Sequence, residues 1–250
     1  MTEERTRWQK LFSLSGVIPL GAFLLLHLWT GAALLSSHAV YDRQVSFLHG
    51  GPILGFLEIV LVLVPLVFHA GYGLWRSVQP KRPGHGYDSD LMLVLERISG
   101  VVVLVFVVAH LWETRMQTWT GGLLVGSYST KLVEHLSSTS AGIPWIALGY
   151  LAGIAATVFH LVNGLTSFAT TWGFAEAPAS HRRARLLFRG AGILVFGIGA
   201  ATVVELATGV RLLSPTHGDS GAPGLCGSAA APVQPAAPVL APSGLPSASP

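Results

Sequence analysis

Five long apolar stretches constrain this chain more than any other feature of its sequence. They cover about residues 12–35, 53–76, 92–115, 143–170 and 190–212. An α-helix needs roughly 20 apolar residues to cross the hydrocarbon core of a bilayer, and each stretch has that length. Only 11% of the residues are charged, against about 25% in soluble domains, and the strand-sized alternation of a membrane barrel is absent. The sequence therefore predicts an all-α integral membrane protein with a five-helix bundle.

The two ends of the chain differ from this bundle. Residues 1–11 are polar and basic, and we expect them to form a short segment before the first helix. The first apolar stretch is too long for the apolar core of a signal peptide, which spans roughly 7–15 residues, so we expect it to be retained. Residues 213–250 are rich in Pro, Ala and Ser, a composition typical of a disordered tail. The predicted domain thus covers residues 12–212.

Lys and Arg residues predict the orientation of the bundle. They concentrate before the first helix, after the second and before the fifth, whereas the opposite loops hold few of them. Basic loops stay in the cytoplasm. We therefore expect the N-terminus in the cytoplasm of a bacterial cell, the helices in its inner membrane and the C-terminal tail outside.

The first four helices contain an internal repeat. Ser15-Gly16 followed by His27-Leu28-Trp29 recurs as Ser99-Gly100 followed by His110-Leu111-Trp112, and Val67-Phe68-His69 recurs as Val158-Phe159-His160. Helices 1–2 and 3–4 are thus predicted to be two copies of one hairpin, with one histidine on each helix.

The depths of these four histidines predict how they pair. Counted at 1.5 Å per residue, His27 and His110 lie about 22 and 27 Å from the cytoplasmic ends of their helices. His69 and His160 lie about 24 and 25 Å from the outer ends. The topology therefore predicts an outer pair, His27 with His110, and an inner pair, His69 with His160, roughly 15–20 Å apart.

Two histidine pairs of this kind match two six-coordinate haems, in which an imidazole on each face saturates the iron and the centre transfers only electrons. Gly16, Gly71, Gly73, Gly100 and Gly164 are expected to give clearance beside the histidine helices. Two alternatives are hydrogen bonding of each histidine to a neighbouring helix and ligation of zinc or copper, although zinc sites usually include Cys or carboxylate ligands. The one cysteine, Cys226, excludes a CxxCH attachment site, so the haems would be b-type. The remaining histidines are expected to be solvated: His38, His49, His85, His135, His181 and His217.

Several clusters in order along residues 7–210 resemble the cytochrome b subunit of type-B succinate dehydrogenases and fumarate reductases. The clusters are Arg7 to Ser13 with Gly16-Val17-Ile18-Pro19 and His27-Leu28; Leu57-Glu58-Ile59 with Pro65-Leu66, His69-Ala70 and Tyr72-Gly73; Ile98 to Gly100 with His110 and Trp112-Glu113-Thr114-Arg115; and Phe159-His160 with Asn163-Gly164-Leu165, Ser167-Phe168-Ala169 and Thr171-Trp172-Gly173.

This resemblance implies a di-haem membrane anchor with His27, His69, His110 and His160 as the axial ligands. It also implies a flavoprotein subunit and an iron–sulfur subunit on the cytoplasmic side, and exchange of electrons with quinone, often menaquinone. The chain itself has no flavin fingerprint and no cluster-binding cysteines, so the dicarboxylate chemistry must reside in other chains. Residues 76–90 and 171–189, with Tyr87 and Trp172, are the expected docking surface.

Glu58 is the candidate for proton exchange with quinone. It precedes His69 by eleven residues, which returns an α-helix to nearly the same face, and it should lie near the outer haem. The alternative is a hydrogen bond from Glu58 to a neighbouring helix or to a haem propionate. Glu205 is a weaker candidate. Glu96, Arg97, Glu113 and Arg115 are expected to serve as interfacial anchors or to hold propionates.

Two other functions are compatible with the sequence. One is the di-haem anchor of a hydrogenase or a formate dehydrogenase, and the other is a haem-free scaffold or transporter. The direction of the reaction, succinate oxidation or fumarate reduction, depends on potentials that the sequence does not encode.

Overall fold

The computed structural model describes residues 2–49, 51–79, 87–121, 128–175, 177–210 and 212, with side chains from residue 7 in the first of these ranges and from residue 91 in the third. Within these ranges the chain is almost entirely helical, with no β-strand and one isolated bridge between Ser140 and Ile143. Five of the helical segments are long and apolar enough to cross a membrane: Arg7–Leu35, Pro52–Ser77, Leu91–Trp119, Trp145–Thr171 and Pro178–Thr208. The predicted all-α five-helix membrane fold is confirmed.

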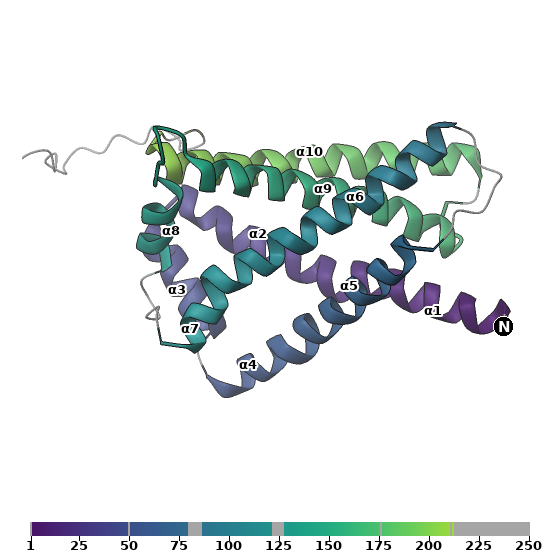
Figure 1. Cartoon of the computed structure of the whole chain (residues 1–250), viewed down its shortest axis with the longest axis horizontal. Helices are drawn as coiled ribbons and strands as arrows, with labels where there is room; N and C mark the ends of the chain where they lie inside the picture. Colours follow the sequence, from purple (N-terminus) through teal and green to yellow (C-terminus); the bar gives the residue numbers. More distant parts are fainter. Residues whose placement is uncertain are drawn as a thin grey trace, which may run out of the picture. The chain divides into compact units, whose positions relative to one another are not determined.

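The first three spans are each built from more than one helical element, and the last two are single helices (Figure 1). Span one contains α1 (Thr2–Ser15), η1 (Gly16–Leu20), α2 (Gly21–Ala32) and η2 (Ala33–Leu35). Span two contains α4 (Pro52–Glu58), η3 (Ile59–Leu63) and α5 (Val64–Ser77). Span three contains α6 (Tyr87–Leu111), η4 (Trp112–Met116) and α7 (Gln117–Trp119), and the last two spans are α9 (Trp145–Thr171) and α10 (Pro178–Thr208).

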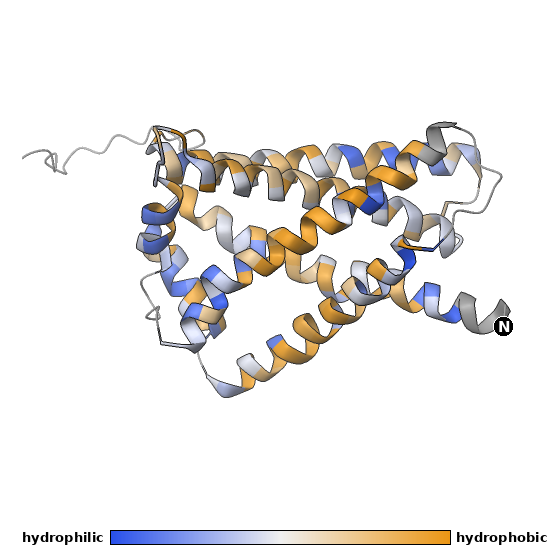
Figure 2. Cartoon of the chain, viewed as in Figure 1, coloured by the Kyte–Doolittle hydropathy of each residue, from blue (hydrophilic) through white to orange (hydrophobic). Residues whose placement is uncertain are grey.

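Two short helices outside the spans were not predicted from the sequence. They are α3 (His38–His49) and α8 (Tyr128–Leu136), and both are more polar than the spans (Figure 2). The fifth span also begins earlier than expected, at Pro178 instead of residue 190. Hydropathy detects only the apolar part of a helix, whereas the basic first turns of α10 continue the same helix beyond it. The predicted tail, residues 213–250, lies outside the described residues.

Three π-helical turns interrupt the first three spans. Pro19 lies inside η1, and Pro65 follows η3 at the start of α5. Proline removes a backbone donor and crowds the preceding turn, and a widened turn accommodates both effects. The third turn, η4, begins two residues after His110. π-Helical turns are frequent at functional sites.

Helix α9 packs closely on both α6 and α10 because small residues line its contacts. A Cβ atom on Gly153 would lie 2.3 Å from the Phe106 ring of α6, and one on Gly192 of α10 would lie 2.6 Å from Val162. Glycine at these positions lets the backbones approach, as is common between membrane helices.

The best-packed part of the described bundle lies around α8. Leu34, Leu136, Ala147, Val203 and Leu206 form a buried cluster there. By contrast, no residue of α4, η3 or α5 is fully buried. The packing of the second span is therefore the loosest among the five, and this span carries Glu58 and His69.

Candidate haem sites

The structure brings the four predicted histidines together as two pairs. In the pair predicted to be the inner one, and called the inner pair below, His69 of α5 faces His160 of α9, with ring centroids 6.3 Å apart and ring planes at 84°. In the pair predicted to be the outer one, and called the outer pair below, His27 of α2 faces His110 of α6, with ring centroids 5.6 Å apart and ring planes at 74°. These are the two pairs that helix topology predicts.

The ring separations fit two axial ligands of one iron. A metal–imidazole bond is about 2.0 Å long and the ring centre lies about 1.1 Å behind the nitrogen, so two rings across one iron have centroids about 6.2 Å apart. The inner pair has this separation, and the outer pair reaches it by opening less than about 1 Å. No cluster of three or more His, Cys, Asp or Glu side chains able to hold a metal occurs among the described residues.

The two pairs lie at separate levels along the helices. The ring of His160 lies against Gly100 of α6, and Gly100 precedes His110 by ten residues. At 1.5 Å per residue this places the inner pair about 15 Å from the outer pair along α6, in line with the expected spacing.

Each inner histidine is backed by a serine from the repeated Ser-Gly dipeptide. Ser15 donates its hydroxyl to the Phe12 carbonyl at 2.8 Å, and its oxygen lies 3.3 Å from His69 Nδ1. Ser99 donates to the Glu96 carbonyl at 2.9 Å, and its oxygen lies 3.3 Å from His160 Nδ1. An Nδ1–H that donates to such an acceptor leaves the Nε2 lone pair free for a metal.

One difference separates the two inner ligands. The Phe12 carbonyl oxygen lies 3.2 Å from His69 Nδ1 and provides a second acceptor for it. The Phe12 ring also stacks on His69, with centroids 4.4 Å apart. Sequence analysis missed these serine contacts, although the repeated Ser-Gly dipeptide was the signal that pointed to them.

The candidate glycines divide into two groups. A Cβ on Gly16 would approach His69 Cε1 to 2.5 Å, and one on Gly100 would approach His160 Cε1 to 3.1 Å. These two glycines make room for the ligand rings themselves. A Cβ on Gly73 would make an ordinary 3.5 Å contact with Phe12, and nothing lies within 4 Å of one on Gly71 or Gly164.

His110 of the outer pair has a tyrosine beside its Nδ1, where the inner histidines have a serine. Its Nδ1 lies 3.2 Å from the hydroxyl of Tyr150 on α9. Its ring also stacks on Phe106, with centroids 5.8 Å apart. Tyr150 was not among the predicted site residues, because forty residues separate it from His110 in the sequence.

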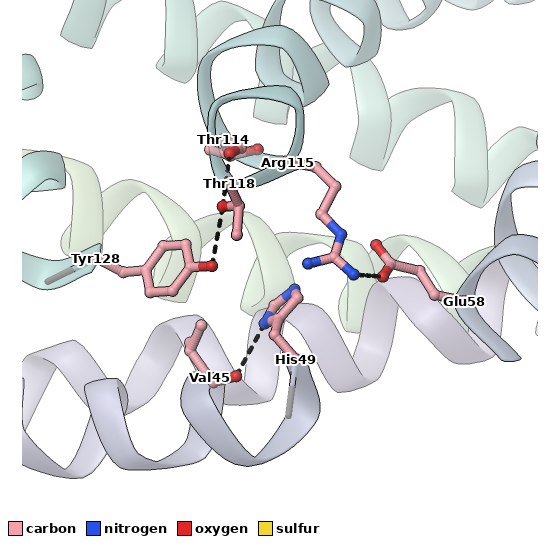
Figure 3. A network of polar contacts seen from close by, with 7 residues as sticks. All are labelled: Val45, His49, Glu58, Thr114, Arg115, Thr118 and Tyr128. Atoms are coloured by element: carbon pink, nitrogen blue, oxygen red, sulfur yellow. Dashed lines mark hydrogen bonds and ion pairs between the residues drawn. The ribbon is translucent and has the colours of Figure 1, made fainter. Parts of the chain in front are cut away.

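Glu58 forms a buried ion pair with Arg115 of η4 (Figure 3). The side chains are 20% and 10% exposed, respectively. This contact is a hydrogen bond between Glu58 and a neighbouring helix, which is one of the alternatives that the sequence left open for this residue. The π-helical turn η3 lies between Glu58 and His69, and its extra residue turns Glu58 by about 100° from the strict α-helical register. Arg115 is buried, and its guanidinium also lies 5.2 Å from the Trp119 ring centre.

Two of the remaining histidines, which were expected to be solvated, are only partly exposed and contact other groups of the chain. His49 is half-buried. Its Nδ1 lies 2.9 Å from the Val45 carbonyl oxygen, and its ring stacks on that of Tyr128 (Figure 3). His135 lies 3.0 Å from the carboxylate of Glu113. Helices α3 and α8 cause both differences, because they fold the outer connections back against the bundle.

At the inner end, side chains tie the helices to each other. Trp172 donates its indole N–H to Ser13 at 3.1 Å, and Lys10 lies over its ring at 5.5 Å. Arg97 donates to the Ser77 carbonyl at 3.1 Å. Residues 80–86 and 176 of the expected docking surface lie outside the described residues, and the side chain of Tyr87 is not described.

Comparison with known proteins identifies the family. The chain is 32% identical over 177 residues to the succinate dehydrogenase cytochrome b558 subunit of Bacillus subtilis (strain 168), a match that covers 70% of this chain and 84% of the relative. The chain belongs to the succinate dehydrogenase cytochrome b subunit family. This family assignment and the five candidate spans make it a multi-pass membrane subunit of a succinate dehydrogenase. No family model and no solved structure matches the chain.

Proposed function

We propose that this cytochrome b subunit binds two b-type haems and passes electrons from an iron–sulfur subunit to quinone. The observation that carries this proposal is the arrangement of four histidines as two close pairs at two levels. In this proposal His69 and His160 ligate the inner haem, and His27 and His110 ligate the outer haem. Each bound haem supplies a one-electron centre that has no open coordination position.

The residues around each pair position the ligands for this role. Ser15 and Ser99 contact the inner imidazoles at Nδ1, which leaves Nε2 of each ring available as the iron ligand. Tyr150 does the same for His110. Gly16 and Gly100 let the inner rings approach the neighbouring helix. The apolar spans keep water from both pairs.

The proposed orientation places the N-terminus in the cytoplasm, the inner pair near the flavoprotein and iron–sulfur subunits, and the C-terminal tail outside. Electrons then travel from the inner pair to the outer pair over about 15 Å. Quinone, menaquinone in this proposal, exchanges electrons at the outer level. Support for the orientation comes from the basic residues of the loops.

The test is to replace each of the four histidines by alanine and to quantify haem in the purified complex. Loss of either His27 or His110 should remove one haem, and loss of either His69 or His160 should remove the other. The two losses should be distinguishable in low-temperature reduced-minus-oxidised spectra. A single class of haem loss for all four variants would contradict the two-site arrangement.

A further inference from the structure

The outer histidine pair is connected through polar side chains to Glu113 and His135, two partly exposed residues. His110 Nδ1 lies 3.2 Å from the Tyr150 hydroxyl, and this hydroxyl donates to Glu113 Oε2 at 3.4 Å. His135 Nε2 of α8 lies 3.0 Å from the same Glu113 oxygen. The Glu113 and His135 side chains are each 36% exposed. The series therefore runs from a proposed haem ligand to groups that water reaches.

Glu113 also lines an apolar hollow on α6. The hollow is open and is lined by residues of α6 and η4 alone: Leu104, Val105, Val108, Ala109, Trp112 and Glu113. Val105, Val108 and Trp112 are 66%, 59% and 63% exposed, so this side of α6 faces away from the bundle, towards lipid. Glu113 is the one ionisable residue in this lining.

These two features match the chemistry of a quinone. A quinone is an apolar ring with an apolar tail, so it reaches the protein through lipid and favours an apolar surface. Its two carbonyl oxygens take up two protons and two electrons when it becomes quinol. A carboxyl group at the edge of an apolar hollow is suited to give those protons.

Glu58, the carboxylate that the sequence predicted to exchange protons with quinone, is less suited to this task. It is paired with Arg115, whose side chain is buried, and Glu58 itself is largely shielded, with 20% of its side chain exposed. A proton on Glu58 would leave the Arg115 charge buried without its counter-ion. Glu113 instead contacts the neutral hydroxyl of Tyr150 and the imidazole of His135, and neither contact is a permanent charge that a proton on Glu113 would leave without a counter-ion.

We propose that Glu113 is the proton-exchanging residue of a quinone site in the α6 hollow, with His135 as its link to water. This inference rests on the proposed electron transfer to quinone and deepens it. The quinone receives two electrons, one at a time. These electrons come from succinate and reach the quinone by way of the outer histidine pair. For each electron, the Glu113 carboxyl transfers one proton to a quinone oxygen and forms an O–H bond. His135 then returns a proton from water to Glu113, so quinone, two electrons and two protons give one quinol.

Tyr150 is a positioning residue in this scheme. It holds the Glu113 carboxylate on one side and His110 on the other, and it stays protonated throughout. Its distances of 3.2 and 3.4 Å to these partners keep the quinone site next to the outer histidine pair, where electron transfer over a short distance is fast.

The test uses the intact complex with the variants Glu113→Gln, Glu58→Gln and His135→Ala. Three quantities are measured: b-haem content, succinate-dependent reduction of a soluble dye, and succinate-dependent reduction of a short-chain quinone. We expect Glu113→Gln to lower kcat for quinone reduction by about 100-fold while haem content and dye reduction stay unchanged. His135→Ala should lower the same kcat by about 10-fold, with recovery on addition of imidazole.

Glu134→Gln is the matched control. Glu134 lies on α8 close to His135, is 69% exposed and pairs with Lys131, but it does not contact the series from His110. Its quinone reduction should equal that of the unmodified complex. Loss of quinone reduction in Glu58→Gln together with a normal rate in Glu113→Gln would overturn the proposal and assign the proton to Glu58.

A second variant and a labelling experiment test the hollow without changing a charge. Val108→Trp should fill the hollow and raise KM for the short-chain quinone at least about 10-fold, with normal haem spectra. A photoactivatable azido-quinone should label residues 104–113, and label only on other helices would overturn the site. Absence of succinate-reducible haem from the unmodified complex would instead contradict the proposed electron transfer itself, so the two failures are distinguishable.

Discussion

The inner and outer histidine pairs are built from the same repeat, yet their surroundings differ. Around the inner pair, the polar contacts of both rings end at serine hydroxyls and backbone carbonyls within the bundle. Around the outer pair, the contacts of His110 continue through Tyr150 to Glu113 and His135. The inner surroundings contain no proton relay among these contacts, whereas the outer surroundings lead to ionisable groups. The two copies of the hairpin thus share their histidines but differ in the side chains that those histidines contact.

The largest effect that tests this comparison is expected when the glycines beside the inner pair are replaced by alanine. Gly16→Ala should remove the inner haem and lower the haem-to-protein ratio to about half, because the new Cβ would lie 2.5 Å from His69 Cε1. Gly100→Ala should have a smaller effect, since its contact with His160 is 3.1 Å. Haem is quantified as the pyridine haemochrome.

Gly164→Ala is the control for that series, because nothing lies within 4 Å of its added Cβ. Alanine is favoured over glycine inside a helix by about 1 kcal/mol, so any haem loss in Gly16→Ala reports the steric contact. Equal haem content in all three variants would show that these glycines do not shape the inner site.

The next effect concerns the buried ion pair of the second span. Arg115→Gln should destabilise the complex by about 3 kcal/mol, because Glu58 keeps a buried charge without a partner. The double variant Glu58→Gln/Arg115→Gln should recover most of that loss. Thermal unfolding of the detergent-solubilised complex measures both. If the double variant is as unstable as Arg115→Gln, the pair does not act as a unit.

A smaller effect is expected at the inner iron. Ser99→Ala removes the hydroxyl next to His160 Nδ1, which makes the imidazole a weaker electron donor. The midpoint potential of the inner haem should rise by about 20–40 mV, with the outer haem unchanged. A potentiometric titration of the b-type absorption bands measures both haems. Ser36→Ala, whose hydroxyl bonds only the Ala33 carbonyl, should move neither.

The smallest effect is expected for Ser15→Ala in the same titration. His69 Nδ1 keeps the Phe12 carbonyl as an acceptor at 3.2 Å, so the potential should rise by less than about 20 mV. A larger shift in Ser15→Ala than in Ser99→Ala would show that the Phe12 carbonyl does not substitute for the serine.

Helix number and histidine pairing could be predicted from the sequence because both follow from long apolar runs and from the direction in which each helix runs. The residues at which helices begin and end were harder to predict. Hydropathy gave residue 190 as the start of the fifth span, but the basic turns of α10 extend to Pro178. The polar helices α3 and α8 have no long apolar pattern, so they were missed.

The partners of the site residues could not be predicted in the same way. Ser15 and His69 are 54 residues apart, and Arg115 and Glu58 are 57 residues apart. Contacts over such separations depend on the rotation of each helix about its own axis. The π-helical turns change that rotation, and hydropathy does not detect them.

The π-helical turn between Glu58 and His69 has a consequence for how this family can diverge. Each such turn contains one residue more than an α-helix of the same height, and removing one residue there would restore regular winding and swing one half of the span through about 100°. Side-chain exchanges inside Ile59–Leu63 should be tolerated as long as they stay apolar. Deletion of any single residue from it should separate the Arg115 contact from the His69 contact, so the length of this segment should matter more to the structure than its composition.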